Sequence, residues 1–173
     1  MIFLRHPLTD APEGMCYGRF DVGLAPIATE QIADALHALP RTTELVSSPA
    51  SRCRILAERI GQRDQVSIRF DERLQEYDFG EWEGQYWDAI PRTISERWME
   101  DLWNNPPPGG ERYCDLVARV EAALAQVSET ATVICHAGVI RAAIMLRQNR
   151  SFDDVFAKKI PFCTPIHLSL ENA

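Results

Sequence analysis

Two histidines and two arginines of this chain have the chemistry needed to bind and attack a phosphate group. His6 directly follows Arg5, Arg52 lies within a predicted helix, and His136 follows a run of apolar residues. A neutral imidazole, whose unperturbed pKa is ~6.5, is available as a nucleophile at neutral pH. Guanidinium groups offer planar pairs of hydrogen-bond donors that match phosphate oxygens. In combination, these residue types predict chemistry on a phosphate ester.

Each of these residues, taken singly, also has an ordinary structural explanation. A histidine that follows a buried strand is commonly a turn or core residue with a satisfied ring. Arg52, like Arg54 and Arg59, could be a solvated residue on a helix surface. Because 130 residues separate His6 from His136, the two rings form one site only if the fold brings them together.

The segment 73–84 could supply the acid that a phosphate ester needs when its alkoxide leaves. It carries four carboxylates among aromatic residues, namely Glu76, Asp78, Glu81 and Glu83. Burial disfavours charge, so a carboxyl group packed against Tyr or Trp keeps its proton more readily and can donate it. Spacing alone does not select Glu76 over Glu81 or Glu83. An equally simple interpretation is that all four are loop charges beside buried aromatic rings.

The elements that must position these residues alternate between strands and helices. Apolar or β-branched runs predict strands at 2–4, 44–47, 66–70, 131–135 and 166–170. Apolar residues at helical spacing predict helices over 28–39, 48–61, 92–104 and 111–128, and another directly after 138. Ser48-Pro49 is a typical helix start, and Gly61 is typical of the position just past a helix end.

This alternation predicts the α/β class, as a three-layer α/β/α sandwich whose central sheet is mostly parallel and covered on both faces. Ligands in such folds bind beyond the carboxyl ends of the strands. Arg5-His6, the segment 48–52 and the segment 136–138 each follow a predicted strand, so they converge if those strands are neighbours. We expect one domain over residues 1–173, with a small cap around 85–110.

Composition narrows the class of protein. The chain has 173 residues, of which 46% are apolar and 25% charged, and its net charge is −7. A negatively charged protein repels nucleic acid and anionic membranes, so neither is an expected partner. The five scattered cysteines include no C-x-x-C pair, which argues against a zinc site or a disulfide framework and for a reducing compartment. The first residues contain no secretory apolar region, and we expect a cytoplasmic protein.

Six short motifs, in order, resemble those of the histidine phosphatase superfamily, also called the phosphoglycerate mutase-like family. They are Arg5-His6 (R-H-G in the family), residues 16–24 (G-x-x-D-x-x-L), residues 47–52 (S-S-P-x-x-R), residues 74–84 (L-x-E-x-x-x-G-x-x-E-G), Gly109-Gly110-Glu111 (G-G-E) and residues 136–141 (H-x-G-x-x-R). Each motif is weak singly, but their common order from residue 3 to about 145 is specific. The resemblance implies the phosphoglycerate mutase-like fold.

The resemblance also implies catalytic roles. His6 would attack phosphorus and become phosphohistidine, while Arg5, Arg52 and His136 would bind the phosphoryl oxygens. Glu76 would protonate the leaving oxygen and then activate water. Further substrate contacts implied by the resemblance come from Thr9, Gly18, Arg19 and Ala137. No cofactor or metal is required on this scheme, and the expected ligand is a small phosphorylated metabolite; whether two copies form a homodimer is left open.

Two departures from the family pattern keep a second hypothesis open. The family usually has Gly after the nucleophile, whereas Pro7 lacks an N–H. The family's Asn, which follows a few residues later, has no match before Gly18, although Thr9 could take its place. The chain could therefore be a weakened member that binds phosphorylated ligands or protein partners without turnover. A metal hydrolase using His6 and His136 is a weaker alternative, because neither has a carboxylate at ligand spacing.

Substrate choice is narrowed by two further features. The R-H-P opening and the C-Y-G-R-x-D loop most resemble α-ribazole phosphatase-like members, which remove a phosphate when the lower ligand of cobalamin is made. The short segment 85–110 favours a phosphatase over a mutase, since mutases of the family generally carry a longer cap. Its large side chains either stack on a substrate base or sugar, or form the packing face of a cap helix; they are Tyr86, Trp87, Trp98, Met99 and Trp103.

Overall fold

A five-stranded sheet forms the centre of the computed structural model, which describes residues 1–169. The strands are β1 (Ile2–Arg5), β2 (Leu45–Ser47), β3 (Ile68–Phe70), β4 (Thr132–Cys135) and β5 (Ile166–His167). Their order is β3-β2-β4-β1-β5, and all neighbouring pairs are parallel except β1 with β5. The prediction of an α/β fold with a mostly parallel central sheet is confirmed.

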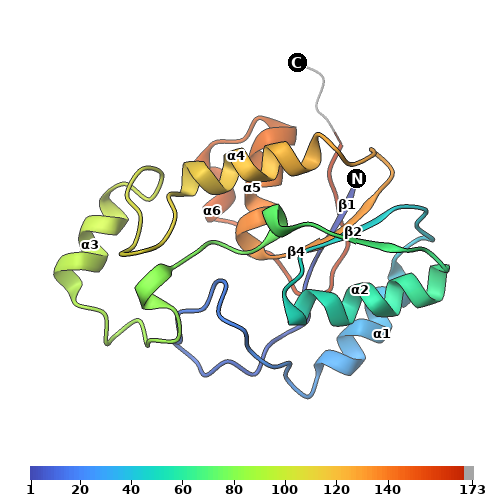
Figure 1. The fold of residues 1–173 in the computed structure, drawn as a ribbon, viewed down its shortest axis with the longest axis horizontal. Helices are drawn as coiled ribbons and strands as arrows, with labels where there is room; N and C mark the ends of the chain where they lie inside the picture. Colours follow the sequence, from blue (N-terminus) through green and yellow to red (C-terminus); the bar gives the residue numbers. More distant parts are fainter. Residues whose placement is uncertain (170–173) are drawn as a thin grey trace.

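Helices cover both faces of this sheet (Figure 1). One face carries α1 (Ala28–Ala38) and α2 (Ser51–Asp64), and the other carries α4 (Tyr113–Leu124), α5 (Ala137–Gln148) and α6 (Phe152–Phe156). Successive strand residues point to opposite faces, so Phe3 packs with α4 and α5 while Leu4 packs with α1 and α2. The strands are buried on both sides, which explains their continuous apolar sequence.

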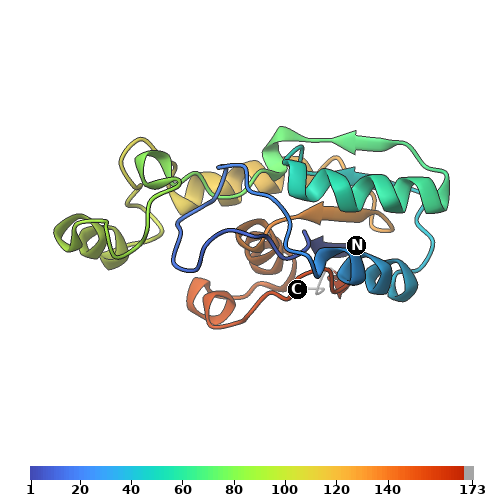
Figure 2. The ribbon, with the colours of Figure 1, turned by 90° about the horizontal axis from the view of Figure 1, so that it is seen from below.

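The connection between β3 and α4 reaches beyond the end of the sheet (Figures 1 and 2). It contains two 3₁₀ turns, η1 (Glu72–Leu74) and η2 (Gly80–Trp82), and then α3 (Arg92–Glu100). No residue of α3 is fully buried, and Ile94 and Met99 are 43% and 56% exposed. The expected apolar stripe on this helix is therefore only partly covered. The helix also ends at Glu100 rather than at residue 104, because residues 101–104 form turns.

The boundaries of α2 differ from the prediction at both ends. The helix begins at Ser51 rather than at residue 48, and the hydroxyl of Ser48 contacts the ring of His136. Gly61 lies inside the helix, and the chain leaves it only at Gln65, which has a left-handed φ of 56°. An added Cβ on Gly61 would lie 3.1 Å from the carbonyl oxygen of Val66. This glycine therefore permits a close approach rather than a helix end.

Other expected boundaries were too generous. Helix α4 runs over 113–124 rather than 111–128, and β5 ends at His167 rather than at residue 170, which lies outside the described residues. Within residues 1–169, none of the helices is long and apolar enough to cross a membrane. All five cysteines are free thiols.

Candidate active site

The central strands bring the two histidines together. β1 and β4 are parallel neighbours with Arg5 opposite Cys135, so His6 and His136 follow at the same level. The backbone N–H of His6 donates to the Cys135 carbonyl at 3.0 Å. The two ring centroids are 5.2 Å apart at an interplanar angle of 61°, and both rings are buried. The expected convergence of residues 6 and 136 is present in the structure.

The tautomer of His6 is fixed by its neighbour in the sequence. The ring Nδ1 lies 2.7 Å from the carbonyl oxygen of Pro7, and because a carbonyl can only accept, Nδ1 carries the proton. The Nε2 lone pair is then left as the nucleophile. Burial, and then the positive charge of Arg52, lower the pKa of His6 to about 3. The ring therefore stays neutral through the physiological range.

His136 is held by two residues of the segment after β2. Its Nδ1 lies 3.3 Å from Nη2 of Arg52, and its Nε2 lies 2.8 Å from Oγ of Ser48. A guanidinium can only donate, so Nδ1 accepts and the neutral ring carries its proton on Nε2, directed at Ser48. Burial, then His6 and Arg52, hold the pKa of His136 well below its ordinary value.

Arg52 is only 1% exposed, which argues against the solvated-helix explanation. Its Nη1 donates to the Phe20 carbonyl at 3.1 Å and its Nη2 to the Gly18 carbonyl. The loop that carries these carbonyls is in turn held by the carboxylate of Glu83. That carboxylate accepts from the backbone N–H groups of residues 18, 19, 20 and 79, at 2.8 to 3.0 Å. Glu83 thus supports Arg52 through the loop.

Arg5 is the last residue of β1 and directly precedes His6. Its Nη1 donates to the Ile160 carbonyl at 3.0 Å, and its guanidinium carbon lies 3.7 Å from the centre of the Phe162 ring. Among the buried side-chain polar atoms of residues 1–169, Nε of Arg5 and Nε of Arg52 lack a hydrogen-bond partner. An unpaired buried donor costs about 1–3 kcal/mol. A phosphate bound at these arginines would supply acceptors.

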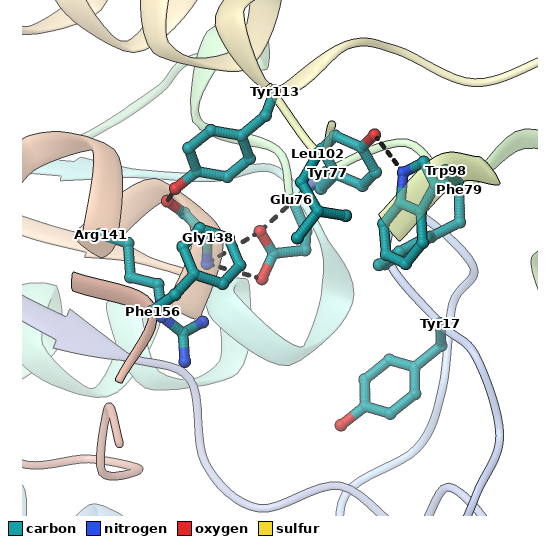
Figure 3. Close-up of a pocket in the computed structure, with 10 residues that line it drawn as sticks. All are labelled: Tyr17, Glu76, Tyr77, Phe79, Trp98, Leu102, Tyr113, Gly138, Arg141 and Phe156. Carbon is teal, nitrogen blue, oxygen red and sulfur yellow. Dashed lines mark hydrogen bonds between the residues drawn. The ribbon is translucent and has the colours of Figure 1, made fainter. Parts of the chain in front are cut away.

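Glu76 is the carboxylate that the structure places at the first turn of α5, the helix that follows His136 directly. Its Oε1 accepts from the N–H of Tyr77 at 3.0 Å, and both its oxygens lie 3.1 Å from the N–H of Gly138, in the first turn of α5 (Figure 3). An added Cβ on Gly138 would lie 2.4 Å from Oε1, so this contact needs glycine. Spacing alone did not separate Glu76 from Glu81 and Glu83, but Glu81 is exposed and Glu83 holds a loop.

Sequence reasoning missed Arg119, which holds the chain around Glu76. Its guanidinium donates to the carbonyls of Arg73, Gln75 and Glu76 at 2.6 to 3.0 Å. The same guanidinium pairs with Glu111 at 2.7 Å. Glu111 belongs to the G-G-E motif, so this motif marked one half of the pair. Arg119 itself lies on an amphipathic helix, where an arginine gives no signal of its own.

The expected substrate contacts are placed unevenly. Ala137 is the first residue of α5, where backbone N–H groups lack partners within the helix. Thr9 donates to or accepts from the Tyr17 hydroxyl at 2.9 Å. The N–H and the carbonyl of Gly18 are engaged by Glu83 and Arg52. Arg19 pairs with Asp78 and Glu111 at the surface. The polar groups of Gly18 and Arg19 are thus engaged by other residues of the protein.

A pocket of about 130 Å³ opens beside Glu76. Its ten lining residues are Tyr17, Glu76, Tyr77, Phe79, Trp98, Leu102, Tyr113, Gly138, Arg141 and Phe156 (Figure 3). Of the large side chains expected on the cap, only Trp98 lines it. Trp87 stacks on Trp98 with 6.0 Å between the rings, and Trp103 packs on Tyr113. No group of three or more His, Cys, Asp or Glu side chains placed to hold a metal occurs within residues 1–169.

Comparison with known proteins agrees with this geometry. The model of the histidine phosphatase superfamily, branch 1, matches residues 1–172. The chain belongs to this superfamily. Its relatives include glucosyl-3-phosphoglycerate phosphatase of Mycobacterium tuberculosis, which is 31% identical over 73% of this chain and 59% of its own. A bifunctional protein of the same organism is 31% identical over 85% of this chain and 43% of its own. The chain thus spans about half the length of these relatives.

A solved structure confirms the fold independently. The α-ribazole phosphatase of Shigella flexneri superposes with a TM-score of 0.84, covering 95% of this chain and 87% of its own, at 20% identity. At this identity the likeness concerns the fold and not the substrate.

Proposed function

We propose that this protein is a phosphomonoesterase that works through a phosphohistidine at His6. The observation that carries the proposal is the bond from His6 Nδ1 to the Pro7 carbonyl, which leaves Nε2 free as a nucleophile. Buried Arg52 and half-buried Arg5, each with a buried and unpaired Nε, contribute positive charge to this ring's surroundings. Phosphatases among the relatives of the chain support the same reaction class.

The first half of the reaction transfers the phosphoryl group. Nε2 of His6 forms a bond to phosphorus while the ester P–O bond breaks, and the carboxyl group of Glu76 gives its proton to the leaving oxygen. Arg5 and Arg52 offset the negative charge of the transferring group, an electrostatic contribution of the oxyanion-hole kind. The proton on Nδ1 stays on the ring and remains hydrogen-bonded to the Pro7 carbonyl, which stabilises the positive charge of the phosphorylated ring.

The second half releases inorganic phosphate. The carboxylate of Glu76 takes a proton from water, the water oxygen attacks phosphorus, and the N–P bond breaks. His6 is then neutral again and Glu76 protonated again. The scheme draws its positive charge from arginines and uses no metal ion.

His136 needs one change before it can bind a phosphoryl oxygen. In the structure its only N–H points to Ser48. A bound dianion raises the pKa of a neighbouring imidazole because opposite charge favours the protonated ring. We propose that phosphate binding either protonates His136 or rotates its ring away from Ser48.

A covalent-trapping experiment tests the proposal. Brief incubation with a phosphate ester radiolabelled on phosphorus, followed by quenching, is expected to leave label on the protein that is acid-labile and base-stable. The variant His6→Asn is expected to carry no label and to lose turnover. Full turnover by His6→Asn would overturn the assignment.

α-Ribazole 5′-phosphate is one candidate substrate. The suggestion rests on the R-H-P opening and the C-Y-G-R-x-D loop of the sequence. The relative from Mycobacterium tuberculosis is named for a different ester, glucosyl-3-phosphoglycerate. Release of phosphate from a panel containing both esters, phosphoserine and phosphoglycerates distinguishes them.

Pro7 favours one alternative function, a weakened member that binds phosphate esters without turnover. Its ring removes the N–H that a glycine would offer at this position. The alternative predicts saturable binding and no phosphate release. Measurable hydrolysis of p-nitrophenyl phosphate, lost in His6→Asn, would eliminate it.

A further inference from the structure

The pocket beside Glu76 lies where the leaving group of the proposed reaction must be. Glu76 lines the pocket, and its carboxylate accepts from the N–H of Gly138, two residues after His136. Tyr17 connects the pocket to the phosphate site, since the Arg52 guanidinium lies 5.7 Å from its ring centre. A proton donated by Glu76 therefore goes to an oxygen whose substituent extends into this pocket.

The walls of the pocket are aromatic. Six of its ten lining residues carry aromatic rings, and the aliphatic side chain of Leu102 adds further apolar surface (Figure 3). Their polar atoms are engaged within the protein. The Tyr77 hydroxyl accepts from Nε1 of Trp98 at 3.3 Å, and the Tyr113 hydroxyl donates to the Gly138 carbonyl at 3.2 Å. The surface offered to a ligand is therefore largely carbon.

One cation, Arg141, lines the pocket, and part of its donor set is engaged by the protein. Nε of Arg141 donates to the Val155 carbonyl at 3.3 Å, and its Nη2 to the Lys158 carbonyl at 3.2 Å. A carboxylate or a set of hydroxyl groups on the substrate would give up its water for few matching partners on these aromatic walls, which is unfavourable. The volume of about 130 Å³ is close to the ~150 Å³ of an apolar cavity that accepts benzene.

We propose that this pocket is a leaving-group subsite for phosphate monoesters whose alcohol carries an aromatic or apolar body about one ring in size. The inference rests on the proposed function and adds the substrate class. It ranks such esters above those of glyceric acid, serine and simple sugars. Glucosyl-3-phosphoglycerate, whose alcohol is rich in polar groups, falls outside the class.

The test compares 2-phenylethyl phosphate with ethyl phosphate. Both release unactivated primary alcohols, so chemical reactivity does not decide the outcome. Burial of a ring against aromatic walls predicts at least ~10-fold higher kcat/KM for the phenylethyl ester. Phosphoserine and 3-phosphoglycerate are expected to be no better than ethyl phosphate. Equal kcat/KM for the two alkyl esters, or a preference for 3-phosphoglycerate, would overturn the subsite.

Binding to His6→Asn separates this proposal from the reaction itself. Calorimetry is expected to give at least ~10-fold tighter binding of 2-phenylethyl phosphate than of ethyl phosphate, whether or not the wild-type protein turns either over. Turnover without this difference contradicts the subsite alone. The difference without turnover contradicts the phosphatase proposal alone.

Matched variants locate the effect. Phe156 lines the pocket and is 38% exposed, so Phe156→Ala is expected to fold. It is expected to lower the phenylethyl preference at least ~3-fold, mainly through KM. Met99 is 56% exposed and does not line the pocket, so Met99→Ala should leave the preference unchanged. Equal effects of the two variants would refute the placement.

Discussion

A single peptide carbonyl determines how His6 presents its nitrogen. Proline at position 7 removes an N–H that a substrate could use, yet its carbonyl binds Nδ1 of the preceding ring at 2.7 Å. Proline in place of the family's glycine thus removes one backbone N–H donor, but it keeps the His6 tautomer whose Nε2 is free to attack. Backbone carbonyls also orient Arg52, because its two Nη groups bind loop carbonyls while its Nε stays unpaired.

At the residue scale, Arg52→Ala is expected to lower kcat/KM at least ~10²-fold, because it removes a preorganised cation from the transition state. Arg52→Lys should restore little, since an ammonium lacks the planar donor pair. Steady-state kinetics on p-nitrophenyl phosphate provide the measurement. Arg59, exposed on the same helix, is the control, and a loss of similar size in Arg59→Ala would show that Arg52 has no special role.

The imidazoles of the site are expected to stay neutral well into acid. The pKa of His6 is lowered to about 3 and that of His136 lies well below its ordinary value. Nuclear magnetic resonance of ¹³C-labelled histidines, assigned through His6→Asn and His136→Asn, should therefore show no titration of either ring between about pH 8 and pH 5. A midpoint near 6.5 for His6 would contradict the buried, arginine-flanked environment.

At the scale of elements, one carboxylate connects two parts of the chain that are far apart in sequence. Glu83 collects four backbone N–H groups, three of them from the loop whose carbonyls hold Arg52. Hydrogen bonds to a charged acceptor are worth about 1.5–3 kcal/mol each. The position of Arg52 therefore depends on a residue that is remote from the phosphate.

Glu83→Gln is expected to lower kcat/KM about 10-fold for all esters alike, because an amide oxygen accepts fewer of these N–H groups. The exposed Glu81 provides the control variant Glu81→Gln. A positioning role also predicts non-additivity, so Glu83→Gln should have little further effect once Arg52 is alanine. Additive losses in the double variant would mean that Glu83 acts independently of Arg52.

How much the sequence predicted follows from the range of the interactions involved. Continuous apolar runs revealed β1 and β4, because these strands are buried on both faces, and apolar residues at helical spacing revealed α1, because one of its faces is buried. The convergence of His6 and His136 required only that their strands be neighbours. The predicted start of α2 was wrong, and the contact of Ser48 with a ring 88 residues away could not be read from the local pattern. Glu83 and Arg119 act on loops distant in sequence, so local patterns could not assign their roles.

At the scale of the whole molecule, burial of two neutral imidazoles makes stability depend on pH. The folded-state pKa of His6 is about 3, below the ~6.5 of an unfolded chain. Between these values the unfolded state binds more protons, so stability increases with pH across this window and is lost as the pH falls. His136 contributes in the same direction.

Urea unfolding at about pH 5 and pH 7.5 measures this linkage. The midpoint is expected to be lower at pH 5, and the difference should shrink in His6→Asn, which has no ring to protonate. Asp64, whose pKa is lowered to about 2, acts only below the ordinary value of a carboxyl group and does not interfere. An unchanged difference in the variant would show that His6 is not the titrating group.

In the proposed function, the segment that carries α3 contacts the alcohol of the substrate rather than its phosphate. In the proposed reaction the phosphate is bound by residues at the ends of buried strands, whereas Trp98, on a helix with no fully buried residue, and Leu102 form part of the wall around the departing alcohol. Mutations of these partly exposed wall residues should therefore alter which alcohol is accepted at little cost to phosphoryl transfer. Changes in selectivity should arise there first when the protein is evolved in the laboratory.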